Sequence, residues 1–144
     1  MKRFLVGLAI FGTLITSAYA DFDYAIKSGV NIIPNKINQL VPCNLGAEVS
    51  YAYKDTHIMS VSADYFINEK KNLPVMLNYK FKTNTNFMVG VGAGMFVDTT
   101  KTPAVSASIS TKIDKNWFLE VKGITRLSRA DRNNFILFSL GYQF

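Results

Sequence analysis

Residues 87–97 read FMVGVGAGMFV, and their alternation predicts how this chain folds. Apolar side chains occupy every second position, beginning at Phe87, and the positions between them include Gly90, Gly92 and Gly94. Alternation with a period of two places the large side chains on one face of a β-strand and the glycines on the other. The stretch therefore predicts a strand with one bulky apolar face and one face that leaves space for neighbours.

The same alternation recurs along the rest of the chain, and segments rich in Asn, Asp, Thr, Ser and Lys separate its repeats. No helical periodicity accompanies it, so the sequence predicts an all-β, antiparallel, up-and-down fold. We expect eight strands, at Tyr24–Ile33, Leu45–Tyr53, His57–Ile67, Leu73–Lys82, Phe87–Val97, Pro103–Ile113, Trp117–Leu127 and Phe135–Phe144.

The two faces of these strands differ sharply in composition. One face is almost wholly apolar or aromatic and carries no charge, whereas the other holds glycine, serine and the charged residues. An eight-stranded barrel has a lumen only just wide enough for side chains, so the bulky face cannot point inward. We therefore expect an eight-stranded transmembrane β-barrel with its apolar face in lipid. A water-soluble barrel with the faces reversed is a distant alternative.

Charged side chains on the inward face should pair with one another, because an unpaired charge in a packed lumen is costly. Counting from the strand ends places Glu48 near the depth of Lys122, and Glu120 near that of Lys27. We expect an ion-pair network that plugs the lumen; an ion pathway is the alternative. The members of the network are Lys27, Glu48, Asp64, Lys80, Glu120, Lys122 and Arg126.

The first twenty residues have the pattern of a secretory signal peptide. A basic start at Lys2 and Arg3 precedes an apolar stretch that ends in Ala18-Tyr19-Ala20. We expect residues 1–20 to be a cleaved signal peptide and residues 21–144 to form the barrel domain. Cleavage removes Lys2 and Arg3 and so lowers the net charge from +6 to +4. The smaller net charge is weaker evidence for a polyanion partner.

Two features at the strand ends point to a known group. Aromatic residues gather at one end of the predicted barrel, as in an interfacial girdle. The chain also ends in alternating Phe138, Leu140, Tyr142 and Phe144. This ending resembles the assembly signal of bacterial outer-membrane barrels. With the signal peptide and eight strands, the chain resembles the small eight-stranded outer-membrane proteins, namely the OmpA transmembrane domain, OmpX and the Ail/Lom and opacity-like group.

The resemblance implies a location and a set of partners. Proteins of that group lie in the outer membrane of Gram-negative bacteria with both termini in the periplasm. The short separators Lys54–Thr56, Thr83–Asn86 and Asp114–Asn116 would then be periplasmic, and the longer ones external. The implied partners are periplasmic chaperones, the barrel-assembly machinery, outer-membrane lipid and lipopolysaccharide. We expect a monomer.

The sequence favours a non-catalytic role in envelope integrity, surface interaction or resistance to external attack. A small porin-like pore and an outer-leaflet lipid-modifying enzyme are the alternatives. His57 is the only histidine, and its neighbours Asp55 and Ser60 do not form a clear triad with it. We expect no cofactor and no metal ion.

Basic residues in two predicted external loops suggest a contact with anions. These are Lys70 and Lys71 in one loop, and Arg129 and Arg132 in the last one. They would bind lipopolysaccharide phosphates, an acidic host polymer or a phage surface. A solvated loop surface is the alternative. Nucleic acid is not expected, because the chain has no recognition motif.

Overall fold

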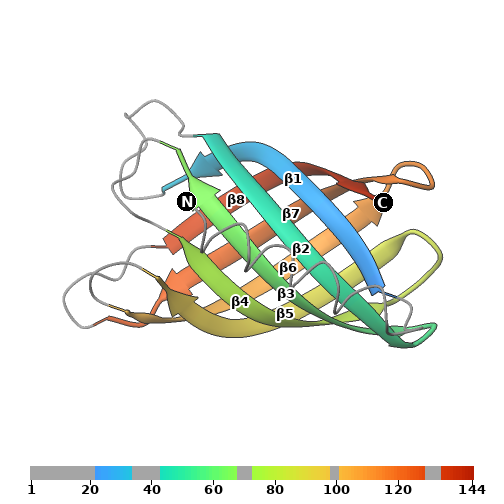
Figure 1. The fold of residues 1–144 in the computed structure, drawn as a ribbon, viewed down its shortest axis with the longest axis horizontal. Coiled ribbons are helices and arrows are strands. Elements are labelled where there is room, and N and C mark those ends of the chain that lie inside the picture. The colour runs from blue at the N-terminus through green and yellow to red at the C-terminus, as the bar shows by residue number, and fades with distance from the viewer. Residues whose placement is uncertain (1–21, 34–42, 68–72, 98–100, 129–133) are drawn as a thin grey trace, which may run out of the picture.

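The computed structural model is a closed antiparallel β-barrel in which each strand pairs with its neighbours in sequence and β1 pairs with β8 (Figure 1). It describes residues 22–33, 43–67, 73–97, 101–128 and 134–144. In that part of the chain there is no helix long and apolar enough to cross a membrane. The strands are β1 (Phe22–Ile32), β2 (Cys43–Lys54), β3 (His57–Phe66), β4 (Pro74–Lys82), β5 (Phe87–Phe96), β6 (Pro103–Lys112), β7 (Trp117–Arg126) and β8 (Asn134–Gln143).

The predicted fold class is confirmed: the protein is all-β in its described part and forms an eight-stranded antiparallel barrel. Each observed strand begins and ends within two residues of its predicted bounds. Differences of this size are ordinary at strand ends, where pairing frays. Period-two alternation predicts the strands because the outward face of each is largely apolar, while the inward face carries most of the small, polar and charged residues.

Short turns join the strands at one end of the barrel. The turns 55–56, 83–86 and 113–116, the start of β1 and the end of β8 lie together at one end, on the right in Figure 1. We call this the hairpin end and the opposite one the far end. In one of these turns the Asn84 side chain accepts hydrogen bonds from the backbone N–H groups of Asn86 (3.0 Å) and Phe87 (2.8 Å). This local bonding explains why an Asn-rich separator makes a tight connection.

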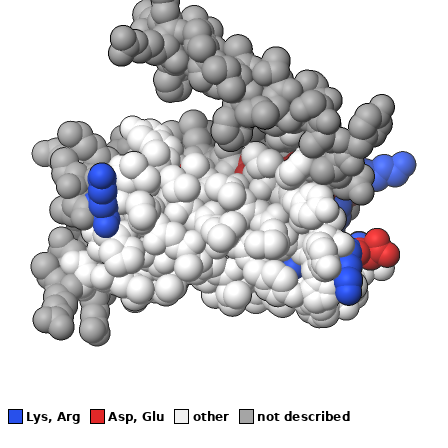
Figure 2. Space-filling view, turned by 60° about the horizontal axis from the view of Figure 1, so that its bottom comes forward, with Lys and Arg blue, Asp and Glu red and all other residues white. Residues whose placement is uncertain are grey.

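Exposure alternates along the strands as the sequence predicts. In β6, Val105, Ala107 and Ile109 are exposed, whereas Ser106 and Ser108 are buried in the lumen. The outward-facing positions together form an apolar wall, and Ile109 is 55% exposed on it. Figure 2 shows one side of this wall as a broad surface with charged residues mainly near its two ends. Most of the large apolar side chains of this barrel are therefore on its outside.

Candidate functional site in the barrel lumen

The lumen holds a cluster of buried charges centred on Lys27. Its Nζ lies 3.0 Å from a carboxylate oxygen of Glu48, 2.6 Å from one of Glu120 and 3.8 Å from one of Asp64. These residues come from β1, β2, β7 and β3, so the cluster ties together strands on several sides of the barrel. Inward alternation on each strand brings the groups together without any loop.

Two further lysines complete the cluster. Lys80 on β4 contacts Glu48 at 2.5 Å and Glu120 at 3.3 Å, and Lys122 on β7 contacts Asp64 at 3.0 Å. All the members are at most 6% exposed. Three ammonium groups therefore face three carboxylates, and the group as a whole is neutral. We call this set the ion-pair cluster; it consists of Lys27, Glu48, Asp64, Lys80, Glu120 and Lys122.

Uncharged polar side chains surround the ion-pair cluster and share its hydrogen bonds. The ammonium group of Lys122 donates to the Ser62 hydroxyl at 2.7 Å, and the Asn78 amide donates to the same hydroxyl at 3.0 Å. The Ser106 hydroxyl in turn donates to the Asn78 carbonyl oxygen at 3.3 Å. These bonds fix the orientation of Lys122 and extend the polar filling across the lumen to β6.

Arg126 was expected in the same network, but the structure places it elsewhere in the lumen. Its guanidinium carbon lies 4.2 Å from the ring centroid of Phe96, in the arrangement of a cation–π contact. Arg126 ends β7 and Phe96 ends β5, so both lie at the far end of the barrel. Depth along the strand separates Arg126 from the ion-pair cluster.

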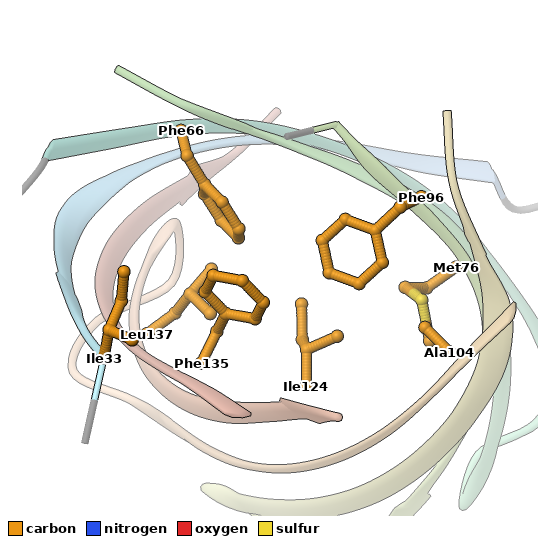
Figure 3. Packing of buried hydrophobic residues seen from close by; sticks show 8 residues of the cluster. All are labelled: Ile33, Phe66, Met76, Phe96, Ala104, Ile124, Phe135 and Leu137. Carbon is orange, nitrogen blue, oxygen red and sulfur yellow. The ribbon is translucent and has the colours of Figure 1, made fainter. Parts of the chain in front are cut away.

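An apolar cluster fills the lumen at the far end, and sequence reasoning missed it (Figure 3). The Phe135 ring lies 5.2 Å from that of Phe66 and 5.5 Å from that of Phe96, measured between centroids. All three rings are at most 1% exposed. The sequence does contain evidence for this cluster, because these large residues occupy inward positions at the ends of strands. The cluster consists of Ile33, Phe66, Met76, Phe96, Ala104, Ile124, Phe135 and Leu137.

The other side of the ion-pair cluster opens into a cavity at the hairpin end. The cavity has a volume of about 330 Å³ and reaches Glu48 and Lys80. Lys82, Lys112 and Asp23 also line it, and all three are partly exposed. The lumen is thus polar and hollow at the hairpin end, charged and packed in the middle, and apolar at the far end.

Aromatic residues contact one another around the outside of the hairpin end. Phe22 and Tyr51 lie 5.3 Å apart, Trp117 and Tyr142 lie 5.0 Å apart, and Phe144 extends the second group at 5.0 Å from Tyr142. Tyr142 and Phe144 belong to the predicted assembly signal. Its other two residues, Phe138 and Leu140, are 42% and 44% exposed on the outer wall.

His57 lies on the outer surface of the hairpin end, away from the lumen. Its Nδ1 shares a hydrogen bond with the Tyr79 hydroxyl, and its ring lies 5.4 Å from that of Phe81. Ser60 is buried in the lumen, and Asp55 lines the lumen cavity. His57 therefore lies on the opposite side of the barrel wall from Asp55 and Ser60.

Several predicted residues lie outside the described part of the chain. These are the signal peptide at 1–20 and the loop residues Lys70, Lys71, Arg129 and Arg132. Among the described residues, no group of three or more His, Cys, Asp or Glu side chains is arranged to hold a metal ion.

No protein-family model and no curated protein matches the sequence. Solved structures do match the fold. Ail of Yersinia pestis in a phospholipid nanodisc has a TM-score of 0.62 and 11% identity, over 86% of this chain and 100% of Ail. Ail in complex with the heparin analogue sucrose octasulfate has a TM-score of 0.56 and 14% identity, over 85% and 97%. The N-terminal β-barrel domain of Pseudomonas aeruginosa OprF has a TM-score of 0.57 and 11% identity, over 85% and 97%.

The chain has the fold of the small eight-stranded outer-membrane barrels. The resemblance predicted from the sequence is therefore confirmed at the level of architecture. Sequence identities of this size show a shared fold and no more. What distinguishes this outer-membrane-type barrel is the set of side chains in its lumen and at its two rims.

Replacing Lys27 by methionine should destabilise the barrel by roughly 3–5 kcal/mol, because three buried carboxylates would then face two ammonium groups. Urea unfolding in phosphatidylcholine liposomes, followed by the fluorescence of Trp117, the only tryptophan, would measure the change.

The matched control is Lys27→Met combined with Glu120→Gln, which leaves two ammonium groups facing two carboxylates. The double variant should recover most of the lost stability. If it is as unstable as the single variant, charge balance is not what the ion-pair cluster provides.

Proposed function

We propose that this protein is a non-catalytic barrel of the outer membrane of a Gram-negative bacterium. The observation that carries the proposal is the continuous apolar wall around a polar, charge-bearing lumen, the reverse of what a water-soluble barrel presents. The aromatic contacts at the hairpin end support a membrane interface there. In this arrangement the hairpin end, with the N-terminus and the C-terminus of the barrel domain, faces the periplasm.

The lumen is closed in this proposal, so the barrel works through its surface and its presence in the membrane. The neutral ion-pair cluster removes free charge from the middle of the lumen, and the apolar cluster fills the far end. The separate placement of His57, Asp55 and Ser60 supports a role without catalysis. The roles that fit are envelope integrity, surface interaction and resistance to external attack.

Cell fractionation tests the location. The protein should sediment with outer membranes and should migrate differently on a gel before and after boiling, because a folded barrel resists detergent at room temperature. A product that appears in the soluble periplasmic or secreted fraction would refute the membrane assignment.

Planar-bilayer recording tests the closed lumen against the alternative of a small pore, which the cavity at the hairpin end favours. The purified protein should insert without steady single-channel steps, because the ion-pair cluster and the apolar cluster lie in series along the lumen. Reproducible conductance steps of one size would establish the pore instead.

The proposed surface ligand is a polyanion, either lipopolysaccharide phosphate or an acidic polymer of a host or phage. The sequence places Lys70, Lys71, Arg129 and Arg132 in external loops, and the similar protein Ail has been solved with a heparin analogue. Charge-assisted hydrogen bonds from these side chains would hold sulfate or phosphate groups.

Reversing two of these charges, with Arg129→Glu and Arg132→Glu, should weaken binding to immobilised heparin about tenfold or more at low salt, and the difference should shrink as salt is added. Surface plasmon resonance would measure both effects. Unchanged binding across the salt series would count against the loops as the binding surface.

A further inference from the structure

A β-bulge at the end of β2 changes the direction of one lysine. Ala52 pairs with Ile58 and Lys54 pairs with His57, so Tyr53 is an extra residue with no partner in the β2–β3 register. Strict alternation from Ala52, which lines the lumen cavity, would turn the Lys54 side chain inward as well. The bulge turns it outward instead, which is a common effect of bulges at barrel rims.

Lys54 lines an open groove on the outside of the hairpin end. The groove has a volume of about 310 Å³, and we call it the headgroup groove; its lining residues are Tyr53, Lys54, His57, Met59 and Tyr79. The ammonium group of Lys54 lies 5.7 Å from the Tyr53 ring centroid. Lys82 ends β4 at the same end of the barrel but lines the lumen cavity. The bulge therefore gives the outer wall a cation at the depth of the aromatic rim.

The groove also contains a hydrogen-bond donor beside this cation. His57 Nδ1 and the Tyr79 hydroxyl bond to each other, so only one of the two groups uses its proton in that bond. Where Nδ1 accepts, the Nε2–H of His57 remains available; where Nδ1 donates, the O–H of Tyr79 remains available. Either tautomer leaves one donor in the groove.

The wall beyond the groove is suited to acyl chains. Met59 closes the groove on the side of the wall, and Val61 follows it on the same face of β3. They are 48% and 50% exposed, respectively. An apolar strip of the outer wall therefore begins beside the cation and the hydrogen-bond donor and runs toward the middle of the barrel.

We propose that the headgroup groove binds the phosphate of a glycerophospholipid in the periplasmic leaflet of the membrane. Lys54 neutralises the phosphate, the His57–Tyr79 pair donates to it, and the acyl chains lie along Met59 and Val61. This rests on the proposed function, which puts the hairpin end at the periplasmic interface. Lipid held there anchors the depth of the barrel at its aromatic rim.

Native mass spectrometry of the full protein folded in detergent tests the proposal with two probes. Palmitoyl-oleoyl phosphatidylglycerol carries the phosphate, and the matching diacylglycerol lacks it. The unchanged protein should retain one phosphatidylglycerol in preference to diacylglycerol. Lys54→Gln should weaken that retention about fivefold, since it removes one cation near the membrane surface, while Lys54→Arg should preserve it.

Lys82→Gln is the matched control, because it removes the same charge at the same end of the barrel but from the lumen side. It should retain lipid as the unchanged protein does. Equal losses in the Lys54→Gln and Lys82→Gln variants, no loss in Lys54→Gln, or equal retention of diacylglycerol would each overturn the groove as a phosphate site.

Gel mobility before and after boiling, scored on the same samples, separates the two levels of the account. A protein that folds in detergent without retaining phosphatidylglycerol contradicts the headgroup groove alone. A protein that does not fold in detergent or bilayers contradicts the membrane barrel on which the groove depends.

Discussion

The narrow lumen of an eight-stranded barrel determines which side chains face inward and which face outward. Because there is little room inside, most of the bulky side chains of each strand must face outward. Glycine and serine occupy many of the inward positions, and the charges in the lumen must balance because they are buried. The neutral set of three lysines and three carboxylates around Lys27 satisfies that requirement. The apolar wall and the polar interior are therefore two results of one geometric limit.

Alternation made the strands and the composition of each face predictable, because both follow from local sequence. The sequence was a poorer guide to which charged side chains pair within the lumen. Counting depth along strands placed Glu120 near Lys27, and the structure joins these two. The same count placed Glu48 near Lys122, whereas the structure joins Glu48 to Lys27 and Lys80, and Lys122 to Asp64. Strands in a barrel are tilted and staggered, so depth from a strand end does not give height along the barrel axis. Pairing across the lumen needs the register of all eight strands.

Two features were not predicted from the sequence, for different reasons. The apolar cluster was visible as inward Phe66, Phe96 and Phe135, but the many small and charged residues on the same face concealed its importance. The bulge at Tyr53 could not be seen, because it depends on which residues of β3 lie opposite β2. The bulge puts Lys54 at the outer rim rather than on the lumen side, where strict alternation from Ala52 would put it. At this rim the strict alternation of inward and outward side chains is interrupted.

Tryptophan quenching would show directly whether the apolar wall faces lipid. Val91 is 62% exposed on β5, in the middle of the alternating stretch 87–97. A Val91→Trp variant, with Trp117→Phe to remove the native signal, would be reconstituted into vesicles. We expect strong quenching by lipids brominated near the bilayer centre and little quenching by aqueous iodide. Quenching by iodide without quenching by brominated lipid would show that the wall faces water.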